Sequence, residues 1–79
     1  MFINRAADGN NNLCGRNVTR LRKTRGLSQR ALADGLQLEG LDIDKNAIQR
    51  IECGKRFVTD IELAAIRRYF GTTYDELLK

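Results

Sequence analysis

A regular alternation of helix-starting and helix-stopping residues constrains the fold of this chain more than any other feature. Asparagine, serine, aspartate and threonine start helices because their side chains accept hydrogen bonds from free first-turn amides. Glycine stops helices because it adopts the left-handed backbone conformation at little cost. With no proline in 79 residues, this alternation predicts short helices joined by tight turns. The starting residues are Asn12, Ser28, Asp44, Thr59 and Thr73, and the stopping glycines are Gly26, Gly54 and Gly71.

Apolar residues recur at helical spacing between these signals. Thr59 with Glu62, and Thr73 with Glu76, have the capping-box form, in which each side chain bonds the other residue's amide. The sequence therefore predicts an all-α fold, a compact bundle of five short helices. Their expected ranges and inward positions are 13–25 (Cys14, Val18, Leu21), 28–36 (Leu32, Ala33, Leu36), 44–53 (Ala47, Ile48, Ile51), 59–70 (Leu63, Ile66, Phe70) and 73–78 (Leu77, Leu78).

Two segments lack this periodicity. Residues 1–12 end in the polar run Asp8-Gly9-Asn10-Asn11-Asn12, which predicts a flexible leader ahead of a domain over 13–79. Within 37–43, Gly40 interrupts the helical pattern. The remaining apolar residues of that segment, Leu38, Leu41 and Ile43, predict a turn held against the core.

Composition excludes several kinds of function. The chain has no histidine, so the commonest general base and zinc ligand are missing, and we expect neither a metal nor another cofactor. Cys14 and Cys53 have the flanks of buried helical positions, which favours reduced thiols in a cytoplasmic protein. No apolar run approaches the roughly 20 residues of a membrane span. The first residues lack the apolar core of a signal peptide, so we expect no membrane partner.

Positive charge is concentrated in one part of the chain, although the formal net charge is only +4. Residues 16–30 contain no acid, whereas acids gather near the C-terminal end. Such an oriented charge distribution favours a polyanionic partner. A solvated helix face accounts for the same cations equally well. The cations are Arg16, Arg20, Arg22, Lys23, Arg25 and Arg30, and the acids are Asp60, Glu62, Asp75 and Glu76.

A series of short motifs resembles the phage repressor/Cro-type (XRE-like) helix-turn-helix family over about residues 13–78. The resemblance implies a lambda-repressor-like DNA-binding domain, in which the second and third helices form the helix-turn-helix. The chain departs from the family between Ala33 and Ile48, where the turn at 37–43 is expanded. The motifs are Leu21-Arg22, Gly26-Leu27-Ser28-Gln29, Leu32-Ala33, the run from Ile48 to Arg56, and the run from Gly71 to Leu78.

The helix over 44–53 has four polar residues on its outer side, Lys45, Asn46, Gln49 and Arg50. The major groove of B-DNA accepts a helix, and there lysine or arginine bonds guanine while asparagine or glutamine bonds adenine. The resemblance implies that Lys45, Asn46 and Arg50 contact bases and that Gln49 is more peripheral.

The resemblance also implies contacts with the DNA backbone. Gln29 matches a phosphate-binding position at a helix N-terminus, where free amides and the helix dipole suit an anion. Ser28 either shares this role or only caps the helix. Lys55 and Arg56 match backbone contacts beyond the third helix, which fix register and add salt-dependent affinity.

Other cations are assigned differently. Arg22 and Glu52 match a partly buried ion pair that joins the first and third helices, so the resemblance implies a structural role for both. Arg16, Arg20 and Lys23 share another face of the first helix. They either steer DNA at long range or form an ordinary solvated face.

These assignments predict sequence-specific binding of double-stranded DNA and repressor-like regulation of transcription. We expect no enzyme, because the sequence has no paired carboxylates, phosphate loop or thiol and base arrangement. A homodimer on a two-fold site is the expected form. Its candidate contacts are Phe57, Phe70, Tyr74 and Leu77.

An alternative from another class is a protein-interaction module with the same fold, since a fold does not fix a function. In this interpretation Leu38, Leu41 and Ile43 of the expanded turn bind the partner. Duplex affinity that falls steeply with salt distinguishes a DNA-binding protein from this alternative.

Overall fold

Side-chain caps fix the start of four of the five helices within residues 4–79, the part of the chain that the computed structural model describes. Each cap accepts a hydrogen bond from the amide three residues later, at 2.8 to 3.2 Å. The predicted caps Ser28, Asp44, Thr59 and Thr73 are confirmed. The helices are α1 (Gly15–Thr24), α2 (Gln29–Leu38), α3 (Lys45–Glu52), α4 (Asp60–Phe70) and α5 (Tyr74–Leu78).

Only one of the two predicted capping boxes forms completely. Thr59 and Glu62 bond each other's amides, as expected. Thr73 caps α5 through the Glu76 amide, but the Glu76 carboxylate forms an ion pair with Arg20 at 3.6 Å. Lys79 lies closer to the same carboxylate, at 3.1 Å, so the second box is a single cap whose glutamate pairs with cations instead.

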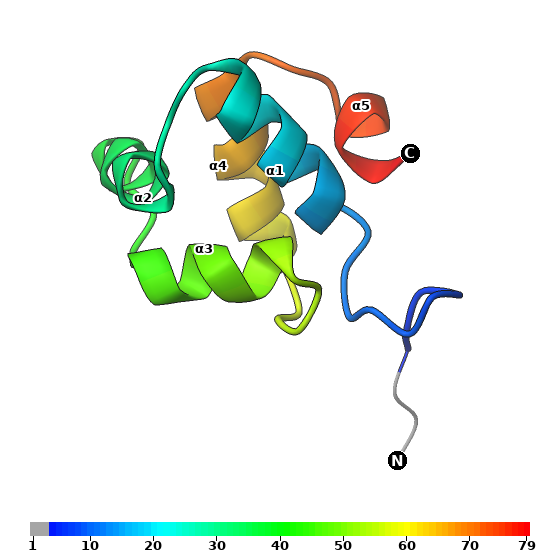
Figure 1. Ribbon diagram of the computed structural model, residues 1–79. Helices are drawn as coiled ribbons and strands as arrows, with labels where there is room; N and C mark the ends of the chain where they lie inside the picture. The colour runs from blue at the N-terminus through cyan, green and yellow to red at the C-terminus, as the bar shows by residue number, and fades with distance from the viewer. Residues whose placement is uncertain (1–3) are drawn as a thin grey trace.

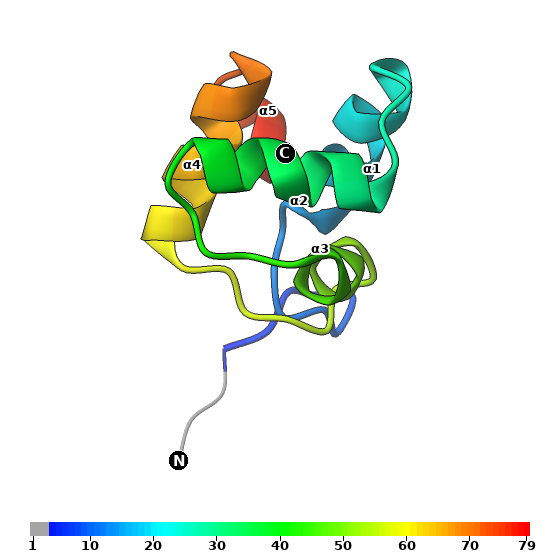
Figure 2. The same ribbon diagram turned by 90° about the vertical axis from the view of Figure 1, so that its left-hand side faces the viewer.

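The helices α2 and α3 cross each other, as expected of a helix-turn-helix. α2 is seen end-on in Figure 1 and lengthwise in Figure 2, whereas α3 shows the reverse. α1 contacts α3 and α5, and α2 contacts α4. α3 therefore lies at one edge of the bundle, with one side against its neighbours and the other side facing outward (Figure 1).

Every helix contributes a fully buried apolar side chain to one core. Among the predicted inward positions, Leu78 alone is exposed, at 39%. The others are buried or partly buried, which confirms the predicted helical faces. The core residues with 0% exposure include Val18, Leu32, Ile48, Ile66 and Leu77.

The connector between α2 and α3, residues 39–44, differs from the predicted turn. α2 continues through Leu38, whose side chain is 91% exposed, so the expectation that it holds the turn against the core is wrong. It lies on the outer side of the last helical turn. Leu41 and Ile43 are buried, and Gln37 Nε2 donates to the Ile43 carbonyl at 2.8 Å. Two apolar side chains and one hydrogen bond therefore hold the connector.

Three other residues correct the sequence-based expectations. Phe70 and Leu77 are 3% and 0% exposed, so neither is available as the dimer contact expected of it. Both belong to the core because they point inward from α4 and α5. Cys53 is exposed, not buried, because it occupies the C-cap of α3. Cys14 is buried, and burial raises the pKa of its thiol to about 11. Both cysteines are free thiols.

The backbones of α1 and α3 meet closely at Gly15. A Cβ at this position would overlap the carbonyl oxygen of Ile51 and would lie 3.3 Å from that of Glu52. Cys14 is the N-cap of α1 but forms no side-chain cap, and Asn12 Oδ1 accepts from the Gly15 amide at 2.8 Å instead. A glycine here lets the end of α3 lie directly against the start of α1.

An ion pair joins the same two helices further along α1. Arg22 Nε and Nη2 donate to the two carboxylate oxygens of Glu52 at 2.7 and 3.0 Å. Arg22 Nη1 donates to the Leu27 carbonyl at 2.8 Å, and Gln29 Nε2 donates to Glu52 at 3.2 Å. The two charged side chains are only 13% and 7% exposed. This bidentate pair therefore links α1, α3 and the start of α2.

Replacing Gly15 with alanine tests the close approach of α1 and α3. Helix propensity alone would make Gly15→Ala stabilising by about 1 kcal/mol. The contact with the Ile51 carbonyl predicts instead that the free energy of unfolding falls by about 1 to 3 kcal/mol. Urea unfolding followed by circular dichroism measures the change. Lys23→Ala, at an exposed position of α1 without an ion pair in the described chain, is the control, and a stabilised Gly15→Ala variant would contradict the close approach.

Removing one member of the ion pair leaves a buried charge without a partner. We expect Arg22→Ala to lower the free energy of unfolding by about 3 kcal/mol. The double variant Arg22→Met/Glu52→Leu should lose less, because it buries no unpaired charge. Thermal melting of both variants makes the comparison. An unchanged melting temperature for Arg22→Ala would rule out a stabilising pair.

The same pair makes stability depend on pH. Burial alone would raise the pKa of Glu52, but hydrogen bonds from Arg22 and Gln29 outweigh it and hold this pKa below the ordinary 4.5. A lowered carboxylate pKa stabilises the fold above the unfolded-state value, and this contribution is lost as pH falls through the folded-state value. Wild-type unfolding free energy should therefore decline from about pH 4.5 downward. Glu52→Gln should show a shallower decline, and Asp34→Asn, at an exposed residue of α2, is the control.

Candidate nucleic-acid interface

The outer face of α3 carries Lys45, Asn46, Gln49 and Arg50, and all four side chains are exposed. They face outward because Ala47, Ile48 and Ile51 occupy the opposite side of the helix in the core. Within residues 4–79, none of the four forms a side-chain hydrogen bond or an ion pair. The structure thus presents the predicted base-contacting residues together, with their polar groups unused by the fold.

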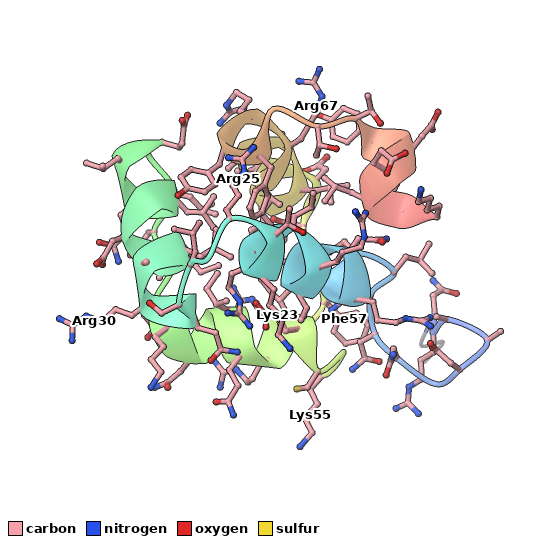
Figure 3. The ribbon with its side chains drawn as sticks, turned by 45° about the horizontal axis from the view of Figure 1, so that its top comes forward. Lys23, Arg25, Arg30, Lys55, Phe57 and Arg67 are labelled. Carbon is pink, nitrogen blue, oxygen red and sulfur yellow. The ribbon has the colours of Figure 1, made fainter. Side chains whose placement is uncertain are left out.

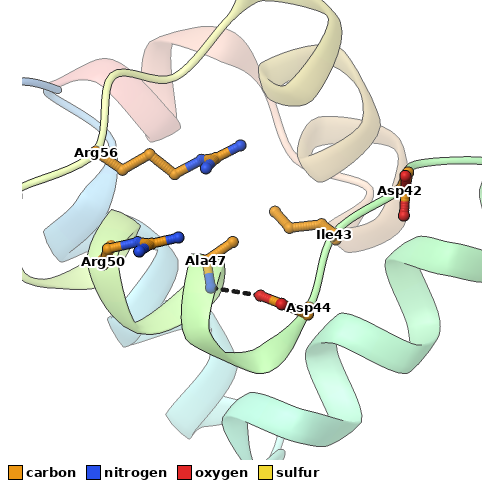
Figure 4. A pocket seen from close by; sticks show the side chains of 6 residues that line it. All are labelled: Asp42, Ile43, Asp44, Ala47, Arg50 and Arg56. Carbon is orange, nitrogen blue, oxygen red and sulfur yellow. Dashed lines mark hydrogen bonds between the residues drawn. The ribbon is translucent and has the colours of Figure 1, made fainter.

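Next to this face lies a polar hollow of about 280 Å³, shown in Figure 4. Arg50 and Arg56 point into it from one side, and Asp42 and Asp44 line another part of its wall. The Asp44 carboxylate is turned toward the Ala47 amide, which it caps. The connector thus contributes two carboxylates to the wall of the hollow that Arg50 also lines, an arrangement that the sequence did not indicate.

Ser28 and Gln29, at the N-terminus of α2, both form side-chain hydrogen bonds within the protein. Ser28 is exposed, and its Oγ accepts from the Ala31 amide, which is sufficient to explain a serine here. Gln29 is half-buried, and its side-chain amide donates to Glu52. The side chain of Gln29 is thus part of the Arg22 and Glu52 cluster. Spacing along the sequence gives no signal for this contact.

The two cations after α3 differ in their surroundings. Lys55 is exposed and forms no ion pair within the described chain. Arg56 Nη2 lies 2.6 Å from a Glu62 carboxylate oxygen, and its side chain is 32% exposed. Burial would raise the pKa of Glu62, but the hydrogen bonds from Arg56 and Thr59 lower it below its usual value. The charge of Arg56 is therefore partly neutralised, whereas that of Lys55 is available.

The predicted basic face of α1 is mostly paired with acids. Arg16 lies 3.1 Å from Asp8, and Arg20 lies 3.6 Å from Glu76. Lys23 is exposed without an ion pair in the described part of the chain. Figure 3 shows Lys23, Arg30 and Lys55 toward the α3 side of the molecule, and Arg25 and Arg67 near α4. Lys23, Arg30 and Lys55, which have no acidic partner in the described chain, thus lie toward α3.

Residues 4–79 contain no cluster of three or more histidine, cysteine, aspartate or glutamate side chains that would hold a metal ion. No described helix is long and apolar enough to span a membrane.

Comparison with known proteins identifies the fold. A family model described as helix-turn-helix matches residues 18–77, which include all of α2, α3 and α4. No curated protein and no solved structure matches the chain significantly. The matched family is one of DNA-binding proteins and not of enzymes. The chain therefore belongs to the helix-turn-helix family of phage repressor/Cro type, and is a DNA-binding regulator of transcription.

Proposed function

We propose that the protein binds specific double-stranded DNA sequences and represses transcription by occupying them. One observation carries this proposal: the outer face of α3 is exposed and unpaired, while its inner face is fixed by the core and by the Arg22 and Glu52 ion pair. A helix held in this way enters the major groove without rearranging the fold. Occupancy of a DNA site excludes other proteins from it, which is sufficient for repression.

Four side chains on this face supply base recognition. Lys45 and Arg50 suit the two acceptors of guanine, N7 and O6. Asn46 suits the donor and acceptor pair of adenine, and Gln49 does the same from a more peripheral position. The carboxylates of Asp42 and Asp44 repel phosphate, which favours base edges over backbone at this end of α3.

Backbone contacts come from both sides of α3. At the start of α2, the first-turn amides of Gln29 and Arg30 suit a phosphate, and Ser28 holds this end of the helix in place. Beyond α3, Lys55 is the principal phosphate contact because its charge is unpaired. Arg56 contributes less, since Glu62 neutralises part of its charge.

The proposed form on DNA is a homodimer with two half-sites about one helical turn apart. Phe57 and Tyr74, at 56% and 44% exposure, are the proposed dimer contacts. The proposed place of action is the cytoplasm, and we propose no cofactor.

The protein-interaction alternative is less well supported by this structure. It requires an exposed apolar turn, but Leu41 and Ile43 are buried and only Leu38 remains outside. A single exposed leucine is ordinary for a protein surface.

Selection of bound duplexes from a random pool tests the proposal directly, because it reports binding, sequence preference and half-site spacing together. Affinity for the selected duplex should fall as salt rises. In a plot of the logarithm of the binding constant against the logarithm of the salt concentration, each phosphate contacted should contribute about −0.9 to the slope. Absence of duplex binding at low salt would reject the proposed function.

Single substitutions distinguish base contacts from backbone contacts. Lys45→Ala and Arg50→Ala should each lose about 1 to 3 kcal/mol on the selected duplex and relax the preference at particular base pairs. Lys55→Ala should weaken all sequences alike and reduce the salt slope by about 1. Arg68→Ala, which removes a cation from an exposed position of α4, is the charge-matched control. Identical behaviour of the three test variants would contradict this division of roles.

A further inference from the structure

The loop between α3 and α4, residues 53–59, is held in place by hydrogen bonds from another segment of the chain. The amides of Lys55 and Arg56 both donate to the Arg50 carbonyl, at 3.0 and 3.2 Å, which closes the end of α3. The carbonyls of Gly54, Lys55 and Arg56 accept no hydrogen bond from the loop or from α4. Within the described residues their only partners lie in the leader, residues 4–12.

Consecutive asparagines of the leader supply these partners. Asn11 donates its backbone amide to the Gly54 carbonyl at 2.8 Å and its side-chain Nδ2 to the Lys55 carbonyl at 2.9 Å. Asn12 Nδ2 donates to the Arg56 carbonyl at 2.7 Å. Three successive loop carbonyls are therefore fixed by two successive leader residues.

The leader has a defined conformation of its own. The Ala6 amide donates to the Asn10 carbonyl at 2.8 Å, and the Asn10 amide donates to the Asp8 carboxylate at 3.0 Å. Asp8 also pairs with Arg16 of α1 at 3.1 Å. The leader is thus attached to α1 as well as to the loop, and Figure 1 shows it beside the C-terminal end of α3.

From this arrangement we propose that Asn11 is a positioning residue for the DNA-backbone contact of Lys55. The inference rests on the proposed function, since it concerns the same interface. The Asn11 side chain bonds the carbonyl of Lys55 itself, and the lysine side chain extends away from the protein (Figure 3). A fixed backbone keeps the ammonium group near one phosphate. Residues 4–12 precede the segment that the family model matches, so this device is additional to the shared fold.

A double-mutant cycle on the selected duplex tests the inference. Lys55→Ala should reduce the salt slope by about 0.9, the contribution of one phosphate. Asn11→Ala should reduce the slope in the same direction by up to that amount, at a temperature well below its melting point. The double variant should match Lys55→Ala alone, because the two residues act through one contact. Asn4→Ala is the matched control, because Asn4 is an exposed leader asparagine whose side chain bonds no other residue within 4–79.

Folding must be separated from positioning. Asn11→Ala retains the backbone bond to Gly54 and the Asn12 contacts, so it should keep a cooperative melt. A wild-type salt slope in Asn11→Ala, or slope losses that add fully in the double variant, would overturn the inference while leaving the proposed function intact. If wild-type protein does not bind the duplex at all, the proposed function fails, and the role of Asn11 fails with it.

Discussion

The bidentate pair between Arg22 and Glu52 is the contact on which the placement of α3 depends. Apolar packing of Ile48 and Ile51 is non-directional, so by itself it tolerates small rotations of the helix about its axis. A guanidinium that bonds both carboxylate oxygens does not tolerate such rotations, because its two parallel hydrogen bonds require the two planar groups to stay aligned. The close approach at Gly15 sets the distance between the helices, and the ion pair sets their rotation. The rotation decides which side chains of α3 face outward.

Local chemistry explains why so much of the fold was predictable. A cap such as Ser28 or Asp44 bonds an amide three residues away, and a stopping glycine such as Gly71 changes only its own backbone angles. Both signals act within one helical turn, so they are readable without tertiary structure. The outer face of α3 follows in the same way, because the inward positions of a helix determine which residues remain outside.

Contacts between distant segments account for what the sequence did not reveal. Gln29 and Glu52 are 23 residues apart, and Asn11 and Lys55 are 44 apart, so no pattern along the chain connects them. Arg56 is close to Glu62 in sequence, but their ion pair depends on the path of the loop between α3 and α4. The prediction that Leu38 packs against the core was wrong for a related reason. Whether α2 ends before Leu38 or continues through it depends on the contacts of the connector that follows, and these are tertiary contacts.

Which cations are available to a charged partner depends on the ion pairs within the fold, and the amino-acid composition does not reveal these pairs. Many of the basic side chains are paired with acids of the same chain, including most of those that made the first helix look basic. A paired cation contributes little to the field outside the protein, whereas an unpaired one contributes fully. The field outside the protein therefore depends on where the unpaired cations lie, and not on the net charge alone. The exposed cations without an acidic partner in the described chain, on α3 or facing its side of the molecule, are Lys23, Arg30, Lys45, Arg50 and Lys55.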